Sequence, residues 1–121
     1  MTIKEIAYEV TKMLDSKKGM QVRLLKIDRV STLADYFIIC TGTSNTHVRT
    51  LCDIAEDTLE KLGENKLGRE GHRGNTWELL DFGAIVVHIF TEEARQFYDL
   101  ERLWADAENV DLTDIIIGDT M

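Results

Sequence analysis

The first candidate for chemistry is the turn Gly42-Thr43-Ser44, which follows the apolar run YFIICT at residues 36–41. A strand that passes through glycine into the start of a helix often holds phosphate on the free amides of that helix. The same residues also suit a plain connection, because Thr43 or Ser44 can cap the next helix. The turn alone leaves two hypotheses open, a nucleotide site or a strand–helix junction.

A nucleotidyltransferase would need two acids that hold magnesium beside such a turn. Acids two residues apart on a strand share a face, so both can bind one metal ion. The nearest candidates, Glu78 and Asp81, are three residues apart and point to opposite faces, and no predicted strand carries Asp-x-Asp or Glu-x-Glu. We therefore favour the junction, and a nucleotide-binding protein or nucleotidyltransferase that uses Gly42–Ser44 is the alternative function.

Other catalytic patterns are weaker still. Asp81-Phe82-Gly83 has the letters of the kinase magnesium triad, but the chain of 121 residues is too short for a kinase, and Asp-x-Gly suits a hairpin turn. Ser44 has no histidine whose spacing predicts a base beside it. The metal-binding residue types show no ligand spacing; they are His47, His72, His88, Cys40 and Cys52. We expect no catalytic residue, no metal and no cofactor.

Hydrophobic periodicity predicts the elements that would position these residues. A Thr2/Glu5 capping box opens a helix that ends near Gly19, and a second helix runs from Thr43 or Ser44 to Gly63. Thr91 caps a third helix that runs from residue 92 to about 104. Strands are predicted at 21–28, 36–41, 76–81 and 84–90. A further short strand is predicted within 65–75, between the second helix and the last two strands. This order indicates a single α/β domain, with a mixed sheet of about five strands and helices mainly on one face.

The two strands around Asp81 and Gly83 should form a hairpin. A turn at 81–84 or 82–83 places Trp77 opposite His88 and Leu79 opposite Val86. One hairpin face is plain core, while the other combines an indole, an imidazole and a carboxylate with apolar side chains. That second face is either an exposed interface, where Trp is a typical anchor, or a surface covered by the last helix or the tail. The sequence leaves both open.

The net charge limits the classes of partner that the protein is expected to bind. The net charge of −8 repels phosphate backbones and disfavours DNA or RNA as the main ligand, whereas a basic protein partner is compatible. Two cysteines in apolar patterns fit a reducing cytosol, and no apolar run approaches the roughly 20 residues of a membrane span. We expect a cytoplasmic protein without a signal peptide. Residues 105–121 hold five acids and no base, which predicts a loosely attached acidic tail after a domain at 1–104.

Three separated motifs resemble the ribosomal silencing factors, also called the Iojap family. They are DYFIICTGTS at 35–44, GxxGxxWxLLDFGxxVVHxF at 71–90 and RxFYxLExLW at 95–104, and the resemblance covers about residues 2–104. It implies a nucleotidyltransferase-like fold without the catalytic acids. It also implies a translational repressor that binds the large ribosomal subunit through a basic ribosomal protein at the subunit interface. Such binding would block joining of the small subunit when nutrients are scarce.

The resemblance also implies a docking surface on the second hairpin face and the FYDLERLW segment. Trp77 would anchor with Leu79 beside it, Asp81 and Glu101 would pair with partner cations, and Tyr98 and Leu100 would extend the apolar patch. His88 would orient the indole. Two further contacts stay open: a minor one with ribosomal RNA through Arg69, His72 and Arg73, and a homodimer that uses the Trp77 face.

Overall fold

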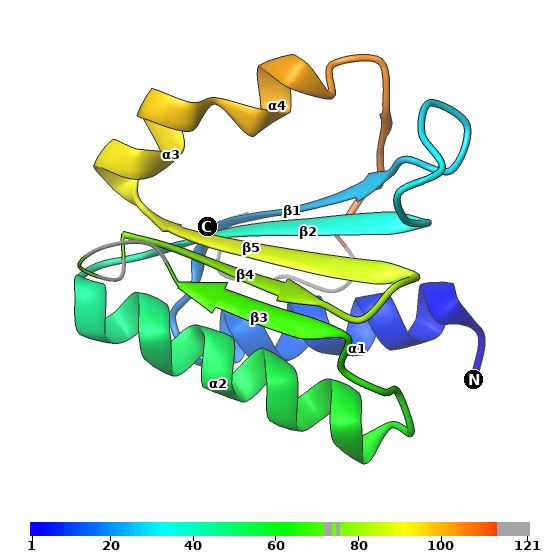
Figure 1. Cartoon of the computed structure of the whole chain (residues 1–121), viewed down its shortest axis with the longest axis horizontal. Helices are drawn as coiled ribbons and strands as arrows, with labels where there is room; N and C mark the ends of the chain where they lie inside the picture. The colour runs from blue at the N-terminus through cyan, green and yellow to red at the C-terminus, as the bar shows by residue number, and fades with distance from the viewer. Residues whose placement is uncertain (72–73, 75, 114–121) are drawn as a thin grey trace.

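The computed structural model describes residues 1–71, 74 and 76–113, and it forms one α/β unit (Figure 1). The N-terminal half contains α1 (Ile3–Ser16), β1 (Met20–Lys26), β2 (Tyr36–Gly42) and α2 (Asn45–Lys61). The rest contains β3 (Gly68–Gly71), β4 (Trp77–Asp81), β5 (Ile85–Thr91), α3 (Glu92–Tyr98), α4 (Leu100–Leu103) and β6 (Glu108–Asn109). Among all the described residues, no helix is long and apolar enough to span a membrane.

The predicted α/β class is confirmed, with a six-stranded mixed sheet in the order β3-β4-β5-β2-β1-β6. The central pair β2 and β5 is parallel, and the other described pairs are antiparallel. Every residue of β2 is buried, as expected for a strand covered on both faces. The carboxyl ends of β2 and β5 therefore meet at one edge of the sheet, where α2 and α3 begin.

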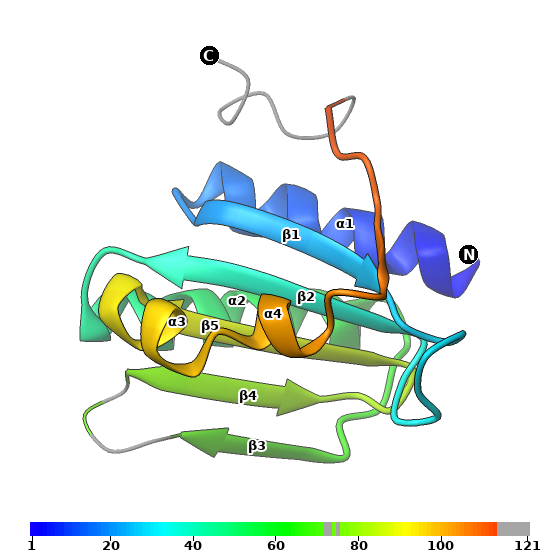
Figure 2. The same ribbon diagram turned by 90° about the horizontal axis from the view of Figure 1, so that it is seen from above.

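The two faces of the sheet are covered unequally. The long helices α1 and α2 pack on one face, where their apolar stripes meet Ile38, Val87 and Ile89. The short helices α3 and α4 lie on the other face (Figure 1). A second core cluster on this side includes Phe37, Val86 and Phe90, and Leu100 of α4 packs against it. Figure 2 shows these short helices lying along the central strands, with the outer strands β3 and β4 beside them rather than under them.

The predicted hairpin register was wrong by two positions. Trp77 lies opposite Phe90, and Leu79 lies opposite His88. The turn is one residue later than expected, because Phe82 is buried in the core and its N–H donates to the Ile85 carbonyl at 2.9 Å. Gly83 then takes the positive φ of +79° that the turn requires. A shift of two keeps every side chain on its predicted face.

The predicted helix over 92–104 is broken at Asp99, whose φ of +47° is left-handed. The expected tail also differs from the prediction where it is described: Glu108 and Asn109 pair with β1, and Val110 and Leu112 pack against the core. Its apolar run at 115–117 lies outside the described residues. The helix starts at Thr2, Ser44 and Thr91 are confirmed, each with a side-chain oxygen accepting a backbone N–H.

Candidate functional site

The second hairpin face holds an aromatic cluster that α3 partly covers. The Trp77 ring stacks on Phe90 with centroids 5.0 Å apart, and Tyr98 of α3 lies 4.5 Å from the same indole. The Trp77 Nε1–H donates to His88 Nδ1 at 3.3 Å. The sequence left open whether this face is exposed or covered by the last helix. Trp77 is half-buried: α3 covers part of the indole, and the rest is accessible.

His88 is a buried support for this cluster. Only 4% of it is exposed, and Phe37 meets its ring edge-on at 4.8 Å. Since Nδ1 accepts the indole proton, the ring is neutral and carries its own proton on Nε2. Burial lowers the pKa of His88 to about 4. The expected role, orienting the indole, agrees with this geometry, and a buried ring is unsuited to direct partner contact.

Leu79, Leu100 and Asp81 occupy the margin of the same face. Leu79 and Leu100 are half-buried and pack against its apolar cluster. The Asp81 Oδ1 accepts the Gly83 N–H at 2.8 Å, so this carboxylate closes the hairpin turn. Its half-buried position still leaves part of the side chain accessible. Asp81 therefore has a structural role in the turn, and a contact with a partner would be additional to that role.

Glu101 has an internal partner that the sequence did not reveal. Its carboxylate accepts Arg95 Nε at 3.0 Å and Arg95 Nη2 at 3.2 Å. The remaining Arg95 nitrogen, Nη1, donates to the Gln21 carbonyl at 2.6 Å and to Thr41 Oγ1 at 2.9 Å. The Arg95 hydrogen bonds lower the pKa of Glu101. Glu101 thus neutralises a buried cation, which makes it a poor choice for pairing with a partner.

Phe97 and Leu103 are accessible apolar residues within the FYDLERLW segment of the predicted docking surface, but the sequence analysis assigned no contact to either of them. They are 81% and 72% exposed, on the same segment as Tyr98 at 40%. A continuous helix would place Phe97, three residues after buried Ala94, on the buried stripe, so the pattern gave no sign of its exposure. We define the α3–α4 face by its accessible and half-buried apolar side chains: Trp77, Leu79, Phe97, Tyr98, Leu100 and Leu103.

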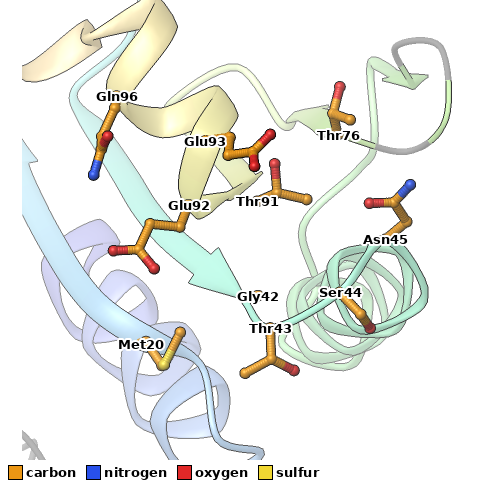
Figure 3. Close-up of a pocket in the computed structure, with 10 residues that line it drawn as sticks. All are labelled: Met20, Gly42, Thr43, Ser44, Asn45, Thr76, Thr91, Glu92, Glu93 and Gln96. Atoms are coloured by element: carbon orange, nitrogen blue, oxygen red, sulfur yellow. The ribbon is translucent and has the colours of Figure 1, made fainter.

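The Gly42–Ser44 junction opens onto a cleft of about 790 Å³ between the starts of α2 and α3 (Figure 3). A Cβ on Gly42 would lie 2.9 Å from the Val48 backbone nitrogen, so glycine is needed for α2 to approach the strand. The Thr43 N–H donates to His47 Nδ1 at 2.9 Å, and Ser44 Oγ accepts the His47 N–H at 3.1 Å. These donors are therefore used within the junction.

The cleft also has the wrong charge for phosphate. Glu92 and Glu93 line it from α3, and the described lining residues include no Lys, Arg or His. Carboxylates repel a polyphosphate, and the described residues contain no group of three His, Cys, Asp or Glu that could hold a metal ion. The geometry favours a strand–helix junction over a nucleotide site.

The predicted basic cluster is only partly described. Arg69 Nη1 contacts Asp53 Oδ1 at 2.7 Å and Glu56 Oε1 at 3.1 Å, so its charge is neutralised inside the chain. His72 and Arg73 lie outside the described residues. The contact of this cluster with ribosomal RNA stays a prediction, without support from Arg69.

Comparison with known proteins decides the family. The family described as "ribosomal silencing factor during starvation" matches residues 1–120. A ribosomal silencing factor of Halalkalibacterium halodurans is 34% identical over 96% of this chain and 99% of its own length. The chain belongs to the ribosomal silencing factor family. A crystal structure of a protein from Chromobacterium violaceum superposes with a TM-score of 0.82 at 33% identity, covering 87% of this chain and 88% of that one.

A more distant relative of this ribosomal silencing factor family is the mouse "mitochondrial assembly of ribosomal large subunit protein 1", 26% identical over 76% of this chain and 42% of its own length. The family gives the chain a ribosome-associated silencing role, and its description names no enzymatic reaction. The nucleotidyltransferase-like comparison stays a prediction. In this ribosomal silencing factor, the α3–α4 face carries the exposed apolar residues Phe97 and Leu103.

Proposed function

We propose that this protein binds the large ribosomal subunit through a basic ribosomal protein at the subunit interface. Bound there, it sterically prevents the small subunit from joining and so silences translation when nutrients are limiting. The family match and the name of the mouse relative support the ribosome and the large subunit. The site of action would be the cytoplasm, where the ribosomes are.

The observation that carries the proposal is the exposure of Phe97 and Leu103 on the α3–α4 face. Large apolar side chains that gather beside half-buried aromatics are typical of interface anchors. Phe97 meets Tyr98 edge-on at 5.1 Å, and Tyr98 in turn contacts Trp77. The exposed rings are thus continuous with the aromatic cluster, which gives them a rigid support.

Charge favours a protein over RNA as the main contact. The chain carries −8 overall, so a basic partner is attracted while the phosphates of ribosomal RNA are repelled. Such complementarity mainly speeds and orients the encounter, whereas burial of the apolar rings supplies affinity. Steric exclusion needs no chemical step, which agrees with the use of Ser44 and His47 as structural groups.

Sedimentation through a sucrose gradient tests the proposal. The protein is mixed separately with purified large and small subunits, and each fraction is probed for the chain. We expect it to migrate with large subunits only. If a second copy of the chain occupied the α3–α4 face instead, the free protein would sediment as a dimer, and this dimer would persist when large subunits are added. Migration with small subunits, or with neither, would contradict the proposal.

A further inference from the structure

A polar pocket of about 550 Å³ lies on the sheet face opposite α3 and α4. Its walls come from the first half of α2 and from the outer strands β3 and β4, and Figure 1 shows α2 running beneath these strands. The described residues that line it are Arg49, Asp53, Arg69, Gly71 and Glu78. All of them except the glycine are charged, and the volume lies within the range typical of small-molecule sites.

Glu78 supplies a buried carboxylate to this pocket. The residue is only 5% exposed, and it shares a face of β4 with the core residue Leu80. Its register partner on β3 is Gly71, and a Cβ on that glycine would lie 2.9 and 3.0 Å from the two carboxylate oxygens. The lack of a side chain at Gly71 therefore leaves space beside the carboxylate.

The described part of the chain supplies no hydrogen-bond donor to this carboxylate. Arg69 Nε is 3.8 Å from Glu78 Oε2, which is too long for a hydrogen bond. Arg69 Nη1 is bound to Asp53 and Glu56 at 2.7 and 3.1 Å. Lys66 Nζ meets Glu56 at 3.2 Å, so three carboxylates share two cations. Since buried polar groups are normally hydrogen-bonded, Glu78 is an acceptor that an external N–H group could satisfy.

A charge of the opposite sign stands at the rim of the pocket. Arg49 is exposed on α2, one turn before Asp53, and it has no ion pair among the described residues. The planar guanidinium group binds carboxylates through two parallel hydrogen bonds. The pocket thus combines a buried acceptor for a cation with an accessible donor for an anion.

We propose that this pocket binds a free α-amino acid with a small or polar side chain. The ammonium group donates hydrogen bonds to Glu78, and Arg49 receives the carboxylate. A diamine would satisfy Glu78 but leave Arg49 unused, and a phosphate would be repelled by Glu78. This inference goes beyond the proposed function and does not depend on it, because the pocket and the α3–α4 face lie on opposite sides of the sheet.

Calorimetry on the free, full chain tests the inference, with each small or polar amino acid titrated in turn. We expect at least one of them to bind. Two derivatives of that amino acid separate its charged groups: N-acetylation removes the ammonium charge, and the carboxamide lacks the carboxylate charge. Each derivative should bind at least tenfold more weakly, because each loses one charge-assisted contact. Spermidine, which has ammonium groups and no carboxylate, should not displace the amino acid.

Two variants assign the contacts to residues. Glu78→Gln keeps the side-chain size, and Arg49→Gln changes an exposed residue that the fold does not need. Each should weaken amino-acid binding at least tenfold. The matched control is Glu70→Gln, because Glu70 is exposed and lies on the opposite face of β3 from Gly71. It should bind within about twofold of wild type.

The inference is wrong if no amino acid binds the wild-type chain. It is equally wrong if the N-acetyl derivative or spermidine binds as tightly as the amino acid itself. Wild-type affinity of folded Arg49→Gln would also overturn it, since the rim would then play no part in holding the carboxylate.

Discussion

Arg95 and Glu101 form a two-pronged ion pair across the break between α3 and α4, with N–O distances of 3.0 and 3.2 Å. The pair spans the left-handed residue Asp99, and the same guanidinium reaches Gln21 of β1 and Thr41 of β2. One buried cation thus ties both short helices to the centre of the sheet. The position of the α3–α4 face depends on this contact.

Glu101→Gln should lower the free energy of unfolding by about 2 kcal/mol. The change leaves the Arg95 cation buried without its counter-charge, and the expected loss is below that for a fully buried pair because the Glu101 side chain is 40% exposed. Urea unfolding measures the difference. Glu60→Gln, exposed on α2, should change stability by less than about 0.5 kcal/mol. Equal effects of the two substitutions would show that the ion pair does not hold the helices.

Ser44→Ala should cost about 0.5–2 kcal/mol of stability, the usual loss of an N-cap. Ser44 Oγ accepts the His47 N–H at 3.1 Å, and silencing by steric exclusion requires no catalytic role of this hydroxyl. Thermal or urea unfolding checks the stability, and sedimentation with large subunits checks the function of the folded protein. Thr50→Ala, exposed on the same helix, should not destabilise. A Ser44→Ala protein of full stability that no longer binds would revive a functional role for the junction.

Acid should destabilise the protein through His88 before carboxylates titrate. The folded pKa is about 4, below the ordinary 6.5, so the unfolded chain binds the proton first and stability falls as pH drops through this window. Between pH 7 and pH 5 the loss from this group is about 2 kcal/mol, and stability is constant above pH 7. Glu101 has a lowered pKa and contributes only below this range.

The comparison of wild type with His88→Gln isolates the effect of the imidazole. Glutamine has no titrating group, and its amide oxygen can accept the Trp77 indole proton. The variant should lose about 2 kcal/mol less than wild type between pH 7 and pH 5. Urea unfolding at the two pH values measures both. If the two proteins lose stability equally, His88 does not titrate as a buried neutral group.

Phe97→Ala combined with Leu103→Ala should weaken binding to large subunits at least 30-fold, as loss of interface anchors does. Both residues are exposed, so stability should change by less than about 1 kcal/mol. Trp77→Ala is a less clean probe, because the indole also packs on Phe90 and Tyr98. The control is Leu67→Ala, since Leu67 is 71% exposed against 72% for Leu103 but precedes β3. If the double variant and Leu67→Ala bind large subunits equally well, the docking site does not include Phe97 and Leu103.

Local signals in the sequence predicted the element types and most helix starts. The caps at Thr2 and Ser44 are short-range patterns, and alternation placed Trp77 and His88 on one face of the hairpin despite the wrong register. The tertiary contacts were out of reach: the Arg95–Thr41 hydrogen bond joins residues 54 positions apart, and no periodicity signals it. The left-handed conformation of Asp99, which ends α3, was likewise not predicted from the apolar periodicity.

The central claim is that the bound protein keeps the subunits apart, and subunit joining measured by light scattering tests it most directly. Large subunits are incubated with the protein, small subunits and magnesium are added, and joining is followed over time. We predict that joined ribosomes decrease as the protein approaches one copy per large subunit, and that Phe97→Ala/Leu103→Ala requires far more protein. Normal joining of large subunits that demonstrably carry the wild-type protein would contradict the claim.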